Sequence, residues 1–413
     1  MKKLALLPFL AFALSQLAAQ IPTAWDEALP LGNGLLGGLV WQKDGRLRLS
    51  LDRADLWDTR PMPNMDDSTL TYQWVAEQVR RGEYGIVQEK LDRPYEREPG
   101  PSKLPGAALE FDISQLGPVE KADLDITTGL VSITWKNGVM FQTFIHARKP
   151  EGWFRWQTAD GRRWTVDGWP TAKLIAPKYD GDPSAPAGSV AGDDLSRLGY
   201  RQADVQSTHH SSLITQIYHQ PCWGGFSYEV AVAERISAQS ATGTWSISSH
   251  FPEKIWADRA EKTVRKSARR GFEKAFAESQ KWWAKYWAAS SVSLPDSVLQ
   301  WQYLLDNYKF GCLARANAPM ISLQGIWTAD NGRLPPWKGD LHHDLNTEMS
   351  YWHAYAANHL DEATGYLRHI RSNDGPHRAW TRRYFGTSGL NVPGVETLLG
   401  QPMGGWIQYA CSP

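Results

Sequence analysis

Over the first 250 residues, hydrophobic and polar side chains alternate with a period of two in several short runs. The clearest runs are residues 46–51, 131–135, 141–145 and 244–248, and this pattern is typical of strands with one buried face. Asn137 and Gly138 lie between the second and third runs, and this dipeptide is the strongest short signal for a β-hairpin. We therefore expect residues 21–256 to form an N-terminal β-sandwich domain.

Two stretches inside this domain depart from the strand pattern. Residues 72–93 predict a helical interruption, because their apolar residues lose the period of two. Residues 175–194 are rich in Pro, Gly, Ala and Asp, which indicates a surface loop. Neither stretch changes the prediction of a large antiparallel sandwich with long loops.

The period changes to that of a helix at about residue 257. Residues 257–290 contain no proline, and Phe272, Phe276, Trp283 and Trp287 recur at spacings of four and seven, as on one face of a long helix. We therefore expect a helical linker over residues 257–297.

Helical segments separated by Gly-rich loops follow the linker. The pattern predicts helices over residues 298–316, 347–359 and 362–384, with a long loop over 318–343. Helices joined in this way suggest a partial α/α barrel over residues 298–413, whose site is built from loops at one end. The predicted fold class is thus a multidomain β + α protein, with a β-sandwich, a helical linker and a partial barrel.

The N-terminus has the features of a signal peptide. Lys2 and Lys3 precede an apolar run over residues 4–14 that is too short to cross a bilayer, and small residues follow it. We expect residues 1–20 to be removed from a secreted or periplasmic bacterial protein, with no membrane contact after cleavage. A buried N-terminal strand or helix is the alternative.

Composition narrows the classes of partner. Lys plus Arg equals Asp plus Glu at 44 each, so no basic surface favours nucleic acid or an anionic membrane. The chain contains 21 tryptophans. About two thirds of them are expected in an aromatic core, but indole rings also stack well on the apolar faces of sugars, so the excess favours a protein that handles an oligosaccharide or polysaccharide. The cysteines Cys222, Cys312 and Cys411 are isolated and odd in number, so we expect no disulfide framework, no zinc site and no cofactor.

The densest group of chemically useful side chains lies in residues 337–348, at the junction of a loop and a helix. Asp344 and Asn346 are two residues apart, so in an extended loop they would point the same way, with His342 on the same side. A carboxylate beside an amide can deprotonate and orient a water molecule.

Two other interpretations of this junction compete with the catalytic one. Asn346 or Thr347 could simply cap the next helix, with Asp344 favoured by the helix dipole. Metal ligation by His342, His343 and Asp344 is disfavoured, because adjacent histidines diverge in an extended chain and the spacing matches no metal motif.

Several motifs in order resemble glycoside hydrolase family 95, the α-L-fucosidase family. Residues 323–327 (LQGIW), 335–337 (PPW) and 344–352 (DLNTEMSYW) resemble successive motifs of its catalytic domain. Residues 25–34 (WDEALPLGNG) resemble the opening of its β-sandwich, and the segments agree in order from residue 25 to residue 406. Two long motifs in the same order are far more specific than either alone.

The resemblance implies a β-sandwich, a helical linker and the (α/α)6 barrel of the six-hairpin glycosidases, with inverting hydrolysis of α-L-fucosides. By position, Asp344 and Asn346 replace the two asparagines that hold and activate the water, and His342 replaces a histidine that contacts substrate. The remaining candidate substrate contacts are His343, Trp327, Trp337, Glu348, Glu396 and Trp406.

The departures from the family pattern carry their own expectations. A carboxylate at Asp344 suits a conventional inverting base, and the sugar could be L-fucose, L-galactose or another pyranose. The family's general acid would lie beyond the end of this sequence, so we expect a C-terminally truncated enzyme with little turnover. The alternatives are a non-catalytic carbohydrate-binding protein and a polysaccharide lyase, and the lyase is disfavoured because its helical part generally precedes its sandwich.

Overall fold

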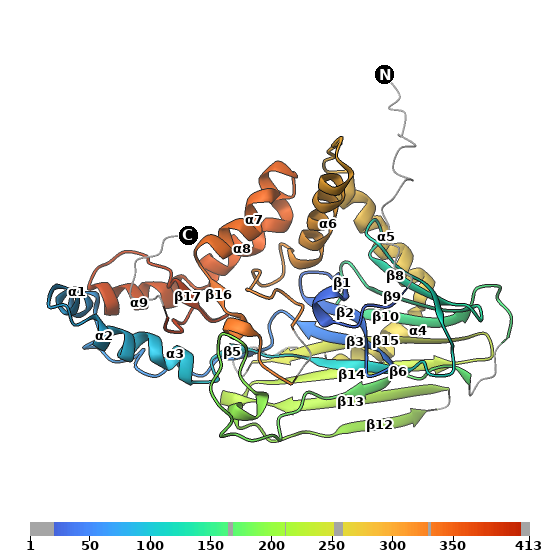
Figure 1. Ribbon diagram of the computed structural model, residues 1–413, viewed down its shortest axis with the longest axis horizontal. Coiled ribbons are helices and arrows are strands. Elements are labelled where there is room, and N and C mark those ends of the chain that lie inside the picture. Colours follow the sequence, from blue (N-terminus) through green and yellow to red (C-terminus); the bar gives the residue numbers. More distant parts are fainter. Residues whose placement is uncertain (1–19, 164–167, 211, 252–258, 329–331, 406–413) are drawn as a thin grey trace.

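The computed structural model describes residues 20–163, 168–210, 212–251, 259–328 and 332–405, and it separates a β-rich half from a helical half (Figure 1). A five-stranded antiparallel sheet has the order β1-β2-β3-β6-β11. Its strands are β1 (Leu29–Gly32), β2 (Leu36–Lys43), β3 (Arg46–Arg53), β6 (Ala107–Asp112) and β11 (Lys173–Ile175). The predicted signal peptide and Trp406 lie outside the described residues, apart from Gln20.

An eight-stranded antiparallel sheet faces the first sheet, in the order β12-β13-β14-β15-β10-β9-β8-β7. Its strands are β7 (Val119–Asp125), β8 (Leu130–Trp135), β9 (Val139–Ile145), β10 (Gly152–Thr158), β12 (Val205–His210), β13 (Leu213–Pro221), β14 (Ser227–Ile236) and β15 (Ser240–His250). The hairpin predicted at Asn137-Gly138 joins β8 to β9. All four runs of alternating residues lie in strands of these sheets.

Aromatic side chains join the two sheets into one core. Phe111 of the smaller sheet contacts Phe141, Phe154 and Trp156 of the larger, with ring centroids 5.4, 5.0 and 5.5 Å apart. Rings at these distances add specific contacts to the burial of apolar area. The predicted β-sandwich is confirmed.

The helical interruption predicted near residues 72–93 is also present. It consists of α1 (Tyr72–Arg80), α2 (Tyr84–Val87), a π-helical turn (Gln88–Asp92) and α3 (Arg93–Arg97). This insertion leaves the sandwich and packs on the helical half, where Tyr72 of α1 lies 6.3 Å from Tyr384 of α9 (Asp374–Phe385), measured between ring centroids (Figure 1). It therefore contributes side chains to the barrel side of the molecule.

The linker is two helices, and the prediction of one long helix was wrong. Gly271, with φ +86° and ψ 156°, separates α4 (Ala260–Arg270) from α5 (Phe272–Trp287). These angles lie in a region that only glycine adopts readily, so the residue can serve as a sharp joint. Within α5 the predicted apolar face holds, since Phe272 and Trp283 are buried.

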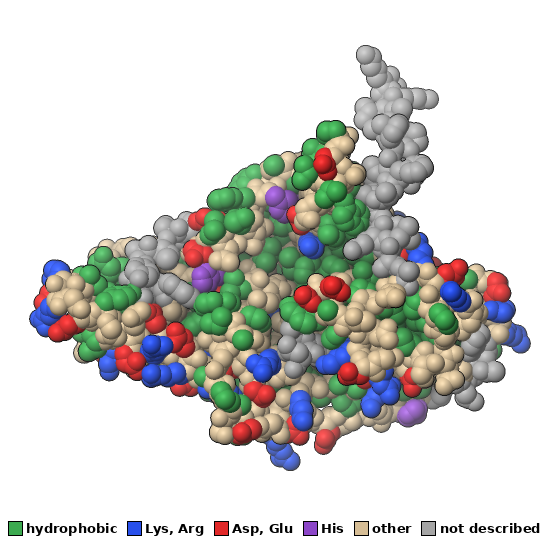
Figure 2. Space-filling view, in the orientation of Figure 1, with side chains coloured by type: hydrophobic (Ala, Val, Ile, Leu, Met, Phe, Trp, Pro, Cys, Tyr) green, Lys and Arg blue, Asp and Glu red, His purple; other side chains and the backbone are tan. Residues whose placement is uncertain are grey.

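The helical half contains α6 (Ser297–Leu313), α7 (Leu345–Ala356), α8 (Leu360–Ser372) and α9. Large apolar side chains stay exposed on α7 and α8, and green patches cover this region in Figure 2; they include Leu345, Met349, Trp352, Tyr355 and Leu367. The succession of helices is that of an (α/α)-barrel-like part, while the domain limits at residues 256 and 297 stay predictions. No helix within the described ranges is long and apolar enough to cross a membrane.

Candidate functional site

The loop before α7 is held from two sides. Trp337 and Lys338 both have positive φ angles, 53° and 57°, which cost free energy for residues with a Cβ unless the surroundings impose them. The Tyr95 hydroxyl oxygen of α3 lies 2.9 Å from the Trp337 carbonyl oxygen, and the Trp337 amide donates to the Ser189 carbonyl at 2.7 Å. The predicted surface loop 175–194 is therefore a loop, but its Ser189 end is buried against the site.

A two-stranded ladder fixes the next residues. β16 (Leu341–His342) pairs with β17 (Val395–Glu396), and the His343 amide donates to the Gly394 carbonyl at 2.8 Å. Because successive side chains of extended backbone point to opposite sides, His342 and His343 diverge. The expectation that these adjacent histidines point apart is confirmed, and each enters a different cluster.

His342 lies between two carboxylates. Its Nδ1 is 3.3 Å from Asp340 Oδ1, and its Nε2 is 3.3 Å from Asp344 Oδ2. Burial lowers the pKa of His342, but the hydrogen bond to Asp340 and the charges of Asp340 and Asp344 outweigh it, so the net pKa is raised. The Tyr95 hydroxyl donates to the other oxygen of the buried Asp340 at 2.6 Å.

Asp344 is the N-cap of α7. Its Oδ1 accepts from the Asn346 amide at 3.2 Å, and such a cap satisfies one of the free N–H groups at a helix start. The helix begins at Leu345, two residues before the predicted start, so the expectation of an extended chain through Asn346 was wrong. The side chain of Asp344 is 51% exposed, and Asn346 is exposed in the first turn. The structure thus brings His342, Asp344 and Asn346 together at one surface.

His343 points into a buried cluster around Glu396. Glu396 accepts hydrogen bonds from the Nε2 atoms of His343, His369 and His377 at 2.7, 2.6 and 2.7 Å. Burial alone would raise the pKa of Glu396, but these three bonds and the neighbouring histidines hold it well below its usual range. Both His343 and Glu396 were predicted substrate contacts, yet their side chains are fully buried and cannot touch a sugar in this conformation.

Sequence reasoning missed His369 of α8 and His377 of α9. They stand 27 and 19 residues before Glu396, in no recognisable motif. The two histidines are eight residues apart, a spacing that would place them on similar faces of one continuous helix. The turn between α8 and α9 lies between them and interrupts the helix. The signal in the sequence was therefore too weak to find them.

The ligand atoms of His343, His369 and Glu396 lie within 4.8 Å of one another, so a metal site deserves a geometric test. Zinc–ligand distances of about 2.0–2.1 Å imply roughly 3.3 Å between ligand atoms in a tetrahedral site. The nitrogen–oxygen distances here are 2.6 and 2.7 Å, which suit charge-assisted hydrogen bonds. Metal-bound histidines also donate their second N–H, but Nδ1 of His343 and of His377 lacks a partner among the described residues. The donor set does not fit a tetrahedral zinc ion.

The other predicted substrate contacts are dispersed. The Trp327 indole donates to the Leu31 carbonyl at 2.8 Å and packs near Trp41, so it joins the barrel loop to the sandwich. Trp337 is half-buried against the apolar cluster that contains Tyr95. Glu348 is half-buried in the first turn of α7, close to Asp344 in sequence. Of these three residues, Glu348 is the closest in sequence to Asp344.

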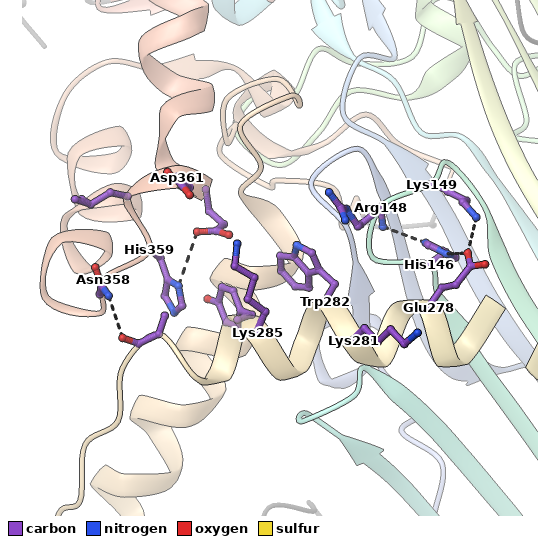
Figure 3. A pocket seen from close by; sticks show the side chains of 14 residues that line it. His146, Arg148, Lys149, Glu278, Lys281, Trp282, Lys285, Asn358, His359 and Asp361 are labelled. Carbon is purple, nitrogen blue, oxygen red and sulfur yellow. Dashed lines mark hydrogen bonds and ion pairs between the residues drawn. The ribbon is translucent and has the colours of Figure 1, made fainter. Parts of the chain in front are cut away.

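A large cleft lies elsewhere, between α5 and the start of α8. It has a volume of about 850 Å³ and is lined by Lys281, Lys285, Tyr286 and His359, among others (Figure 3). The His359 ring stacks on Tyr286 with centroids 3.8 Å apart, and Lys149 pairs with Glu278 at 2.5 Å. None of the predicted site residues that the structure describes lines this cleft. The cleft and the acids and histidines of residues 340–346 therefore lie in different parts of the molecule.

Comparisons with known proteins agree with both halves of the fold. Residues 297–411 match the model of the glycosyl hydrolase family 95 catalytic domain, and residues 16–157 match that of the glycosyl hydrolase family 65 N-terminal domain. No curated protein matches the chain. The match over residues 297–411 confirms the family resemblance found in the motifs.

A solved structure described as a putative kojibiose phosphorylase from human microbiome is similar over 92% of this chain, with a TM-score of 0.52 and 9% sequence identity. The chain spans about half of that protein, 48% of its length. At this identity the likeness concerns the fold alone, and it confirms the order of sandwich, then helices.

Proposed function

We propose that this chain, whose two halves resemble domains of glycosyl hydrolases, removes a terminal α-L-fucosyl or related α-L-galactosyl residue from glycans with inversion. Asp344 is the general base in this proposal, and Asn346 orients the attacking water. The single observation that supports it best is the setting of Asp344, an exposed carboxylate with both oxygens held, at the loop that carries the family motif.

The proposed step uses the two oxygens of Asp344 differently. One faces His342 and the other accepts from the Asn346 amide, so the carboxylate has one orientation and a free lone pair toward solvent. This lone pair takes a proton from water while the water oxygen bonds to the anomeric carbon and the bond to the leaving oxygen breaks. That leaving oxygen must receive a proton from a second carboxyl roughly 6.5–9.5 Å from the base.

The buried acids near Asp344 do not suit this second role. Asp340 and Glu396 are fully buried and hydrogen-bonded to other side chains, so neither reaches a leaving oxygen in this conformation. The proposal therefore predicts weak hydrolysis of ordinary glycosides. A glycosyl fluoride should still be hydrolysed, because fluoride leaves without general-acid protonation.

The experiment measures fluoride release from α-L-fucosyl fluoride and α-L-galactosyl fluoride by the purified protein. We expect Asp344→Ala to lower the rate by about 10²–10⁴-fold, the usual loss for one acid–base group, and added azide to restore turnover with a β-glycosyl azide as product. Asp374→Asn, which alters an exposed carboxylate of α9 paired with Arg378, serves as the control. Wild-type rates in Asp344→Ala would contradict the assignment.

The alternative is a non-catalytic carbohydrate-binding protein. It would replace the first proposal if calorimetry found binding of L-fucose or its oligosaccharides while neither fluoride was hydrolysed. We also propose that the protein is secreted or periplasmic, and N-terminal sequencing of the protein expressed in a bacterium tests this. An intact Met1 on protein that is found only in the cytoplasm would contradict it.

A further inference from the structure

Both ring nitrogens of His342 are engaged by the protein itself. Nδ1 faces Asp340 and Nε2 faces Asp344, each at 3.3 Å, and a histidine has no other hydrogen-bonding atom in its ring. A sugar hydroxyl could bind His342 only by displacing one of these carboxylates. The predicted role of His342 as a substrate contact is therefore a poor match to its surroundings.

We propose that His342 is instead the positioning residue of Asp344, an imidazolium held between that exposed carboxylate and the buried Asp340. This inference rests on the proposed function, since it concerns the same base. Two carboxylates on opposite ring nitrogens each accept one N–H, which only the protonated ring can supply. Asp340 thereby keeps the ring charged, and the charged ring holds Oδ2 of Asp344 so that its Oδ1 faces the start of α7.

The groups around the triplet support this assignment. From α3, Tyr95 donates to Asp340 Oδ2 at 2.6 Å, which leaves Oδ1 for His342. Lys338 is buried and interacts with the charge of Asp340, and burial lowers the pKa of Lys338 to about 8. From α7, the Thr347 hydroxyl donates to the His342 carbonyl at 2.6 Å. Glu396 of β17 is hydrogen-bonded to three other histidines, on the opposite side of the ladder.

A charged His342 makes a specific prediction for the pH profile of glycosyl fluoride hydrolysis. Base catalysis without a general acid should otherwise reach a plateau once Asp344 is ionised. Here the rate should fall again on the alkaline side, where His342 loses its proton and its bond to Asp344; we call this fall the alkaline limb. Asp340→Asn removes the buried charge beside His342, so the pH at the midpoint of the alkaline limb should decrease by about 1 pH unit or more.

The experiment records this profile for the wild type, Asp340→Asn, His342→Gln and the control Asp374→Asn, with circular dichroism to verify folding. We expect a lowered limb in Asp340→Asn, no alkaline limb in His342→Gln and no change in the control. A limb that is unmoved in Asp340→Asn, while Asp344→Ala is inactive, would overturn the role of His342 and leave the proposed function standing. Wild-type turnover in Asp344→Ala would instead overturn the function itself.

A second measurement needs no turnover. The imidazole of His342 can be titrated by NMR in protein labelled at histidine, with His342→Gln to assign its signal. We expect a midpoint above the ordinary value near 6.5 that falls in both Asp340→Asn and Asp344→Asn. A midpoint at or below 6.5 in the wild type would overturn the proposal.

Discussion

Glu234 of β14 carries a carboxyl group inside the sandwich, and its burial should make the stability of the domain depend on pH. Its side chain is 1% exposed. Oε2 accepts from the Ala172 amide at 3.1 Å, and Oε1 has no hydrogen-bond partner among the described residues. Burial raises the pKa of Glu234 from 4.5 to about 7, and the Ala172 bond offsets only part of that effect.

The size and sign of the effect follow from proton linkage. A shift of one pKa unit corresponds to about 1.36 kcal/mol, so a shift from 4.5 to about 7 corresponds to about 3 kcal/mol. Between these values the folded protein binds a proton that the unfolded chain has lost. The free energy of unfolding should therefore be unaffected below pH 4.5, decrease as the pH rises to about 7, and stay lower above it.

Glu234→Gln tests this reasoning, because glutamine is nearly isosteric and does not titrate. Urea unfolding monitored by tryptophan fluorescence at pH 5 and pH 8 gives the stability difference between variant and wild type. We expect this difference to shift in favour of the variant by about 2.5 kcal/mol between pH 5 and pH 8, since a small part of the effect is already lost at pH 5. Glu120→Gln, an exposed position on β7, controls for general charge effects. A difference that does not change with pH would refute the buried, proton-binding carboxyl.

The remaining predictions concern the buried cluster and the linker. Glu396→Ala should lower the free energy of unfolding by about 3–5 kcal/mol, because it removes the acceptor of three buried imidazoles. Chemical unfolding measures this loss, and a loss under 1 kcal/mol would contradict the prediction. Zinc or EDTA should leave the melting temperature unchanged and mass spectrometry should find no stoichiometric metal, whereas one bound zinc per chain would show that the cluster opens to admit it. Gly271→Ala should cost about 1–3 kcal/mol through its φ of +86° alone, since nothing lies within 4 Å of the added Cβ. The control Gly375→Ala, equally open but without positive φ, should be neutral or slightly stabilising in thermal unfolding.

Local pattern alone determined much of the architecture. Strand alternation located β3, β8, β9 and β15. In β8 and the first part of β9 the period of two matches burial of one face, whereas β3 and most of β15 are buried on both faces. The loop before α7 was found in the same way, since its motif concentrates acids, histidines and an amide within a few residues.

The break of the linker helix at Gly271 was not predicted from the local sequence pattern. The apolar face at helical spacing begins directly after this glycine at Phe272, no proline lies in residues 257–290, and a single glycine inside a helix costs only about 1 kcal/mol. The break occurs because α4 packs on β14 and β15, while Phe272 and Phe276 of α5 pack on Phe144 of β9. Packing on two different parts of the sheet requires a change of direction that the sequence does not announce.

The site residues also divide into those whose proximity follows from the sequence and those brought together by the tertiary structure. The sequence placed Asp344, Asn346 and His342 together because they are neighbours along the chain. The cap that Asp344 forms is also a local contact, with the Asn346 amide. Only the tertiary structure decided that His343 turns inward to a carboxylate 53 residues away. The Tyr95 hydroxyl reaches Asp340 across 245 residues, through an insertion of the sandwich domain that packs on the barrel helices. Hydrogen bonds between distant segments depend on how whole elements pack, and no local period records them.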